Sequence, residues 1–216
     1  MTPRADTARM ESEIPISALV LAGGRSSRFG SDKMAAQLAG QPLLHHAIRA
    51  VVNVCDEVLV VAGPDGLTLP LPGGSRVPVR VITDAEPFAG PLVALLLAAR
   101  EAQGARLLVV AGDMPRLVPD LLRRLLTWPD DWKGICLEEG GSVRPLPCGL
   151  DRAATLRAGG ALIDEGHRSL RDLIGRLGVQ TLPESQWRLL DPLALSLRDI
   201  DLLVDLTRES DRPGTS

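Results

Sequence analysis

The chain has 216 residues, of which 45% are hydrophobic and 24% charged, and its formal net charge is −3. This composition excludes disorder over the whole chain, and the length favours a single domain. An acidic balance argues against a duplex-binding surface, which needs clustered cations. With aromatic residues at only 2%, few side chains are present on which single-stranded bases could stack. We therefore expect a globular protein with an aliphatic core and no nucleic-acid partner.

Cysteine usage and the N-terminal segment bear on the compartment. Cys55, Cys136 and Cys148 are widely spaced and form no CxxC pair, which argues against a zinc ribbon or a disulfide framework. Residues 1–13 are polar and lack the apolar core of a signal peptide. The longest apolar run, residues 91–99, is far shorter than the roughly 20 residues that span a bilayer. We therefore predict a cytoplasmic protein with no membrane contact.

Three segments differ in character along the chain. Residues 1–13 and 208–216 are polar, and we expect a flexible leader and a flexible tail there. Between them, short apolar runs that end at turn residues predict buried strands. These runs cover residues 16–21, 57–62, 77–83 and 106–111. The pattern predicts one domain over residues 14–207.

Helical spacing of apolar residues accompanies these strands. The patterns lie in residues 43–52, in the segment that follows Gly90-Pro91, and in residues 118–126. Alternating strands and helices predict a single-domain, three-layer α/β/α fold with a mostly parallel, Rossmann-like sheet. Later in the chain the pattern is less regular. It favours strands at residues 134–138 and 143–150 and helices at residues 151–158 and 170–177, the last with Ser169 and Asp172 as a capping pair.

A glycine-rich, cationic loop follows the first predicted strand. It reads LAGGRSSRFGSDK over residues 21–33 and contains Arg25, Arg28 and Lys33. Glycines let the backbone approach a phosphate, Arg can donate two hydrogen bonds to it, and Lys adds a point charge. Ligands of parallel α/β sheets bind beyond the carboxyl ends of the strands, where this loop begins. The segment therefore predicts a polyanion site, although a solvated turn with incidental charges is the simpler alternative.

Two familiar glycine motifs do not match this loop. A P-loop requires GxxxxGK followed by Ser or Thr, whereas Gly30 is followed here by Ser31-Asp32-Lys33. A dinucleotide fingerprint requires GxGxxG, which the segment lacks. The loop is therefore assigned to neither class.

Two carboxylates follow later strands. Asp84 ends the run VITD, and Asp113 follows VVAG and precedes Met114-Pro115. Carboxylates at the ends of neighbouring parallel strands can converge on one site, and Mg²⁺ is commonly held by one or two carboxylates together with phosphate oxygens. Asp113 is the better candidate, because Gly112 and Pro115 make a sharp exit turn. The alternative for each residue is a turn or cap role, which Asp often has.

The first loop resembles the signature of the molybdenum cofactor guanylyltransferases, which are MobA-like nucleotidyltransferases. The resemblance implies the nucleotide-diphospho-sugar transferase type of fold and a loop wrapped around the triphosphate of GTP, with Lys33 on a phosphate. The guanine and phosphate site would be lined by Leu21, Ala22, Gly23 and Gly24. Related cytidylyltransferases usually have alanine at the position of Gly23, so the resemblance favours GTP.

Later segments are similar to the same family. GDMP implies Mg²⁺ binding by Asp113, and VITD implies contact between Asp84 and the nucleotide. FAGPLVAL, residues 88–95, is similar to a helix start beside the nucleotide, where free N–H groups favour anions. A well-capped core helix is the alternative interpretation of that segment.

The second half carries a weaker resemblance. RPLPCGLDRAA and GHRSLRDLI are similar to segments near the second substrate, which makes Arg144, His167 and Arg168 candidate contacts to it. A solvated rim, or a cap by Ser169, is an equal alternative. Near the end, Asp199 and Asp201 stand where the family has two asparagines, and leucines replace its Thr-Pro. The resemblance thus implies further Mg²⁺ ligands at Asp199 and Asp201.

Together these features predict an enzyme that transfers GMP from GTP to the phosphate of molybdopterin and releases pyrophosphate. Arg25, Lys33 and Asp113 are the predicted catalytic residues, Arg28 assists on the triphosphate, and Mg²⁺ is the cofactor. A molybdoenzyme or cofactor-delivery protein is the expected transient partner. Two alternatives remain: CTP or a sugar or alcohol phosphate as substrate, and a nucleotide-binding partner protein without turnover.

Overall fold

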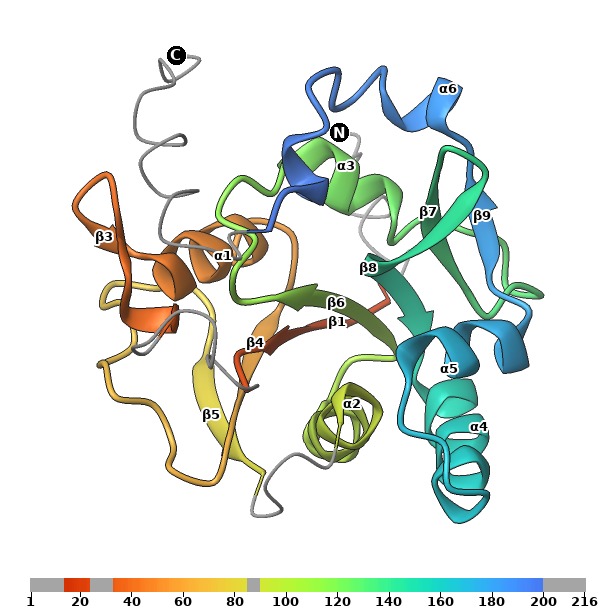
Figure 1. Cartoon of the computed structure of the whole chain (residues 1–216), viewed down its shortest axis with the longest axis horizontal. Coiled ribbons are helices and arrows are strands. Elements are labelled where there is room, and N and C mark those ends of the chain that lie inside the picture. Colours follow the sequence, from red (N-terminus) through yellow and green to blue (C-terminus); the bar gives the residue numbers. More distant parts are fainter. Residues whose placement is uncertain (1–13, 24–32, 85–89, 200–216) are drawn as a thin grey trace, which may run out of the picture.

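A mixed seven-stranded sheet is the centre of the computed structural model, which describes residues 14–23, 33–84 and 90–199 (Figure 1). Its strands, in spatial order, are β5 (Val79–Thr83), β4 (Glu57–Ala62), β1 (Ile16–Leu21), β6 (Arg106–Ala111), β8 (Ser142–Asp151), β7 (Gly134–Glu139) and β9 (Gln180–Leu182). The first four run parallel, β8 is antiparallel to both β6 and β7, and β9 is parallel to β7. The predicted mostly parallel sheet is confirmed.

Helices cover both faces of this sheet (Figure 1). One face carries α1 (Leu43–Val51) and α3 (Pro119–Arg124), and the other carries α2 (Pro91–Glu101), α4 (Arg152–Asp164) and α5 (Leu170–Leu177). The remaining elements are η1 (Lys33–Ala35), the β2–β3 hairpin (Gln37–Leu38 and Gln41–Pro42), α6 (Glu184–Trp187) and η2 (Leu195–Leu197). The arrangement is the predicted three-layer α/β/α fold.

Two aliphatic cores result from the strand period of two. On β1, Ala18 and Val20 pack into the cluster under α1 and α3, whereas Leu19 packs into the cluster under α2, α4 and α5. Because side chains alternate along a strand, a strand buried on both faces must be apolar along most of its length. This requirement explains why short, unbroken apolar runs are a reliable signal of the central strands.

The observed boundaries of the strands and helices agree best with the predicted boundaries where the element is completely buried. The strands predicted at residues 16–21, 57–62 and 106–111 agree with β1, β4 and β6, while β5 begins at Val79 rather than at residue 77, and α3 is shorter than the predicted 118–126. The end predicted for the helix at residues 151–158 is wrong, since α4 continues to Asp164. Gly159 explains this: a Cβ there would lie 2.5 Å from the side chain of Leu96, so the glycine permits close helix packing and does not end the helix.

The predicted capping pair of α5 is half confirmed. The Ser169 hydroxyl accepts a hydrogen bond from the N–H of Arg171 at 3.0 Å, as an N-cap residue should. The Asp172 carboxylate does not return to the N-cap, and instead lies 2.9 Å from Nδ1 of His167. The competing partner is an imidazole five residues earlier, which a sequence pattern for capping does not consider.

All three cysteines are buried free thiols. Burial raises the pKa of Cys55 to about 12 and that of Cys136 to about 11, so both thiols stay protonated at neutral pH. Within the described ranges, no helix has the length and apolar character needed to cross a bilayer.

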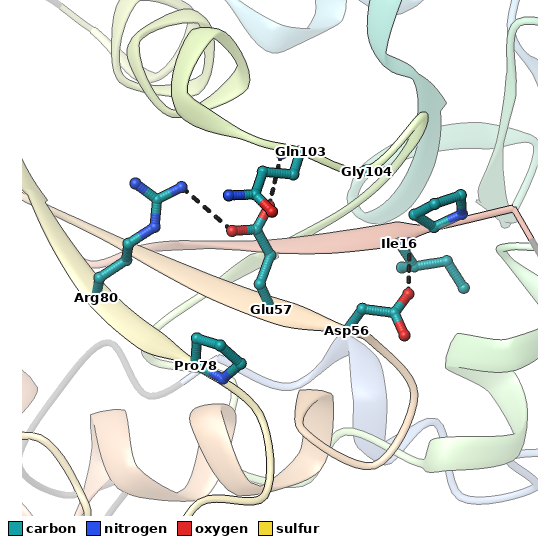
Figure 2. A pocket seen from close by; sticks show the side chains of 8 residues that line it. Ile16, Asp56, Glu57, Pro78, Arg80, Gln103 and Gly104 are labelled. Carbon is teal, nitrogen blue, oxygen red and sulfur yellow. Dashed lines mark hydrogen bonds and ion pairs between the residues drawn. The ribbon is translucent and has the colours of Figure 1, made fainter.

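A buried carboxylate closes the amino-terminal edge of the parallel strands (Figure 2). Glu57 on β4 accepts hydrogen bonds from the Ser17 hydroxyl at 2.6 Å, from the Gln103 N–H at 2.6 Å and from Arg80 at 3.2 Å. Ser17 in turn accepts from the Gly104 N–H at 2.8 Å. The network joins β1, β4, β5 and the segment before β6, and it lines a small hollow at this edge.

Replacement of Glu57 tests this network. Burial raises the pKa of the Glu57 carboxyl, but the hydrogen bonds from Ser17, Gln103 and Arg80 outweigh burial and hold the pKa below its usual value. A lowered pKa in the folded state stabilises the fold above the unfolded pKa, and this contribution is lost as the pH falls through the folded pKa. We expect Glu57→Gln to lower the free energy of unfolding near neutral pH by about 2 kcal/mol.

Urea denaturation over a pH series measures this effect. The difference between the wild type and Glu57→Gln should narrow toward acid pH, where both side chains are neutral. Glu101→Gln is the matched control. The Glu101 side chain is exposed, and its carboxylate lies 3.9 Å from the guanidinium of Arg80, which also contacts Glu57. If Glu57→Gln lowers the free energy of unfolding by the same amount at every pH, the stabilising role of the charged carboxylate is contradicted.

Candidate nucleotide-binding site

The carboxyl end of β1 lies at a point where the chain changes direction across the sheet. The chain passes from β1 to β4 on one side, and only after β5 does α2 lead to β6 on the other side of β1. Connections that leave a parallel strand in opposite directions open a crevice at its carboxyl end, which is where ligands of open α/β sheets bind. The predicted glycine-rich loop begins at this point.

Backbone hydrogen bonds continue past the ends of the strands and fix the edge. They run from Ala22 N–H to Val61 O at 2.8 Å, from Gly112 N–H to Leu21 O at 2.9 Å, and from Asp84 N–H to Ala62 O at 2.9 Å. Gly23 lies close to Gly63, since a Cβ on Gly23 would be only 3.3 Å from the Gly63 nitrogen. The backbones of the turns after β1, β4, β5 and β6 are therefore held at one edge.

Lys33 and Asp113 meet at this edge as an ion pair. The distance from Lys33 Nζ to Asp113 Oδ2 is 2.7 Å, and the two side chains are only 12% and 18% exposed. Lys33 begins η1 and Asp113 follows β6 closely, so residues 80 positions apart in the sequence are brought into contact. The structure thus brings together the cation of the first loop and the carboxylate after β6, while their chemical roles stay predictions.

The position of Lys33 depends on a short chain of backbone contacts. The Lys33 carbonyl accepts from the Ala36 N–H at 3.2 Å, and the Ala36 carbonyl accepts from the N–H of Leu43, the first residue of α1, at 2.9 Å. The fully buried Leu43 and Leu44 hold the start of α1 against the core. The turn that carries Lys33 is therefore connected to the sheet through α1.

The other predicted site residues are distributed differently. Gly24, Arg25, Arg28 and Asp201 lie outside the described residues. Asp84 follows β5 at the same edge as Leu21, Ala22 and Gly23, and Asp199 follows η2 at the end of the last described range.

The three predicted contacts to a second substrate lie on other elements. Arg144 is on β8, where its Nε is 3.6 Å from Glu139 Oε2 across the β7–β8 hairpin. His167 pairs with Asp172, as described above. The Arg168 guanidinium donates to the carbonyls of Ile163 at 3.0 Å and His167 at 2.8 Å, which places it at the end of α4. The structure gives each of these side chains a partner within its own region.

Arg168 also contacts the start of α2. Its carbonyl accepts from the N–H of Leu92 at 3.2 Å, and Gly90 has a φ of 98° with no room for a Cβ, which would lie 2.9 Å from Arg168 Cβ. The start of α2 is expected from the sequence to lie beside the nucleotide. The turn between α4 and α5 is therefore a direct support of that helix start, a contact that sequence reasoning missed.

The donor set at the edge suits a hard cation only in part. Among the residues that the structure describes, no three His, Cys, Asp or Glu residues are grouped so as to hold a metal ion. The Asp113 carboxylate is of the right chemical type for Mg²⁺, which often uses one or two protein carboxylates and completes its shell with phosphate oxygens and water. Asp113 therefore fits as one ligand among several that a substrate and solvent would supply.

The mostly parallel α/β sheet has the paired charges of Lys33 and Asp113 at the point where its strand order reverses, which is where α/β proteins of this class bind nucleotides and other ligands. The family can be stated more closely. Residues 18–182 match the profile of the MobA-like NTP transferase domain, and the chain belongs to this family.

Curated relatives cover nearly the whole chain. A probable molybdenum cofactor guanylyltransferase from Chloroflexus aggregans is 31% identical over 202 residues, which are 88% of this chain and 91% of the relative. A protein of the same description from Mycolicibacterium paratuberculosis is 34% identical over 188 residues, covering 82% of this chain and 91% of the relative.

Solved structures share the fold. Molybdopterin-guanine dinucleotide biosynthesis protein A from Archaeoglobus fulgidus superposes with a TM-score of 0.72 at 21% identity, over 90% of this chain and 97% of that one. The 2-C-methyl-D-erythritol 4-phosphate cytidylyltransferase from Thermus thermophilus superposes with a TM-score of 0.63 at 18% identity, over 89% and 96%. At these identities the likeness shows the fold alone, which the two kinds of enzyme have in common.

A double-mutant cycle tests the ion pair in solution. We expect Lys33→Met and Asp113→Asn each to destabilise the protein in the absence of nucleotide, and the double variant to lose less than the sum, with a coupling of about 1 kcal/mol, because a partly sheltered pair exceeds a fully exposed one. Chemical denaturation at low and high salt measures the coupling, which salt should reduce. If the losses of unfolding free energy in the two single variants add up to the loss in the double variant at low salt, the contact is contradicted.

Proposed function

We propose that the protein is a molybdenum cofactor guanylyltransferase, which transfers GMP from GTP to the phosphate of molybdopterin and releases pyrophosphate. The observation that carries this proposal is the Lys33–Asp113 pair at the carboxyl edge of β1 and β6. A phosphate-binding cation and a metal-binding carboxylate are the two charges that a metal–triphosphate requires at one place. The family and the descriptions of the curated relatives support the choice of reaction.

In this proposal the triphosphate is bound by cations. Lys33 contacts a phosphate, and Arg25 and Arg28 neutralise the remaining charge and the departing pyrophosphate. Lys33 is paired with Asp113, and in this proposal its ammonium turns from the carboxylate toward the phosphate when GTP binds. The Asp113 carboxylate would hold Mg²⁺, with Asp199 and Asp201 as further proposed ligands. The bound ion supplies charge neutralisation at the phosphates.

The nucleoside is assigned to the edge formed by the turns after β1 and β5. Leu21, Ala22, Gly23 and Gly24 lie along the base and the first phosphate, and Asp84 orients the nucleoside. The close approach of Gly23 to the Gly63 nitrogen supports a glycine here, since an added Cβ would have to displace backbone by a few tenths of an ångström. The assignment of GTP over CTP rests on the resemblance of the first loop and on the descriptions of the curated relatives.

The transfer itself needs no covalent intermediate with the protein. The acceptor phosphate attacks the α-phosphorus of GTP in line with the leaving pyrophosphate, so the protein contributes positioning and compensation of charge. Arg144, His167 and Arg168 are the proposed contacts of molybdopterin. Each of these side chains already has a partner within the protein, namely Glu139, Asp172 or the end of α4, and the acceptor would bind to their remaining donors or replace these contacts.

Removal of either charge tests the assignment. We expect Lys33→Ala and Asp113→Ala to lower kcat/KM for GTP by about two orders of magnitude or more, since each removes charge stabilisation at the phosphates. Pyrophosphate release with GTP, Mg²⁺ and molybdopterin measures this loss. Lys133→Ala, at the other lysine of the sequence, and Asp130→Ala are the matched controls and should keep normal turnover. Near-normal turnover in a folded Lys33 or Asp113 variant would remove the proposal.

A nucleotide panel tests the base. A ligand that binds only the folded state stabilises it by RT ln(1 + [L]/Kd), about 2.7 kcal/mol at a concentration of about 100 times Kd. We therefore expect GTP with Mg²⁺ to raise the melting temperature, and CTP, UTP and ATP to raise it much less. Stabilisation by CTP alone would favour the cytidylyltransferase alternative, which shares this fold. GTP binding without pyrophosphate release would favour the non-catalytic alternative.

The cytoplasmic location and the transient contact with a molybdoenzyme or cofactor-delivery protein stay predictions. Both are consistent with the proposed reaction, whose product must reach an acceptor protein.

A further inference from the structure

Directly beside the Lys33–Asp113 pair, a second contact joins the same two turns. A Cβ on Gly112 would lie 2.8 Å from Met34 Sδ, so the Met34 side chain would have to move, and it would make a tight contact of 3.2 Å with Leu44 Cδ1. The thioether of Met34 therefore occupies space that exists only because residue 112 has no side chain. Ala22 at the end of β1 forms another wall, with its Cα 3.5 Å from the same point.

Two neighbouring contacts restrict the relative position of the two turns more than a single contact does. Lys33 meets Asp113, and the next residue on η1, Met34, meets the preceding residue on the β6 turn, Gly112. A single ion pair sets a distance but lets two turns pivot about it. A second contact one residue away removes the pivot, so the direction of approach of Lys33 to the Asp113 carboxylate is also fixed.

The two contacts differ in chemistry. The ion pair must exchange when Lys33 turns to a phosphate, as the proposed function requires. The contact of Met34 with Gly112 and Leu44 is apolar, and it belongs to the core cluster under α1 and α3. Apolar packing does not depend on where the Lys33 ammonium is placed, so it can hold the backbone of η1 through the exchange. A thioether suits this irregular space because it is unbranched and adaptable.

We propose that Met34 and Gly112 are positioning residues that hold the Lys33 turn against the Asp113 turn and thereby set the affinity for the metal–nucleotide. The proposal rests on the proposed roles of Lys33 and Asp113. It adds two residues that do not touch the substrate and that act by keeping the Lys33 and Asp113 side chains in a fixed relative position.

The first test is the affinity for GTP with Mg²⁺, measured by equilibrium binding at a temperature where each variant is folded. We expect Gly112→Ala to raise the Kd about tenfold, because its methyl group displaces the Met34 thioether from the contact that holds the Lys33 turn. Met34→Ala should raise the Kd by a similar factor, while the volume-conserving Met34→Leu should stay within about threefold of the wild type. The KM for the acceptor should not change in any of them.

The double variant is the decisive measurement. In Gly112→Ala/Met34→Ala, the methyl group introduced at position 112 enters space that the thioether no longer fills. The Kd should therefore be no higher than in Met34→Ala alone, whereas independent effects would multiply to about a hundredfold. Multiplicative losses would overturn the proposal, as would a Gly112→Ala variant with an unchanged Kd.

A matched control separates positioning from general destabilisation. Gly159→Ala introduces a comparable clash, 2.5 Å from Leu96, between α4 and α2. It should lower the melting temperature and leave the Kd for GTP unchanged. If Gly159→Ala raises the Kd as much as Gly112→Ala does, loss of stability explains both and the proposal is wrong.

Failure of this inference is distinguishable from failure of the proposed function. If Lys33→Ala abolishes turnover but the Met34 and Gly112 variants bind GTP normally, the function stands and the positioning role falls. If Lys33→Ala itself binds and turns over GTP normally, the proposed function falls first, and a Kd effect in Gly112→Ala then has no Lys33 to act through.

Discussion

The contact between Lys33 and Asp113 at the carboxyl edge of the sheet is the interaction on which the proposed function depends. Two turns that leave different strands approach closely there, and each brings a charge into a setting where less than a fifth of its side chain is exposed. A sheltered charge is tolerated only when it is paired or hydrogen-bonded. Each of these two groups therefore serves as a counterion of the other.

The two ends of the parallel strands carry different kinds of contact. At the amino ends, Glu57 accepts from Ser17, Gln103 and Arg80, and the Gly104 N–H adds to the same network. These bonds lie between parts of the protein, so no substrate is needed to complete them. At the carboxyl ends, the pair is made of groups that have strong alternative partners in a phosphate and a cation. Stability is concentrated at one edge, and exchangeable contacts are concentrated at the other.

Much of the central fold could be predicted because its physical cause is local. Strands β1, β4 and β6 are buried on both faces and so are apolar at nearly every position, which makes their bounds visible in the sequence. That the first loop and the turn with Asp113 begin at one edge follows from a rule of topology, namely that the ends of parallel strands share one edge. The direct contact of Lys33 with Asp113 does not follow from this rule, because Lys33 lies well beyond the end of β1.

The errors come from contacts between distant segments. The sequence pattern ends a helix before Gly159, but the role of this glycine is set by Leu96 on another helix. Asp172 fits a capping pattern, but the imidazole of His167 competes for it. Gly112 is notable in the sequence only for its turn, because the sequence does not show that Met34 fills the space above it. In each case the residue type is informative, and the partner is fixed by packing that local patterns do not contain.

In the proposed function, Lys33 and Asp113 exchange partners, and this exchange requires that something other than the ion pair hold the backbone of the two turns in place. While Lys33 holds Asp113, the carboxylate is available to a cation only in competition with an ammonium 2.7 Å away. A triphosphate offers Lys33 another anion, so nucleotide and cation each favour the binding of the other, and this coupling is reciprocal. If the ion pair were the only link between the two turns, breaking it would let them separate at the moment when both charges must face the same ligand. The apolar contact of Met34 with Gly112 persists when the charges exchange, and for that reason we regard it as the permanent part of the site.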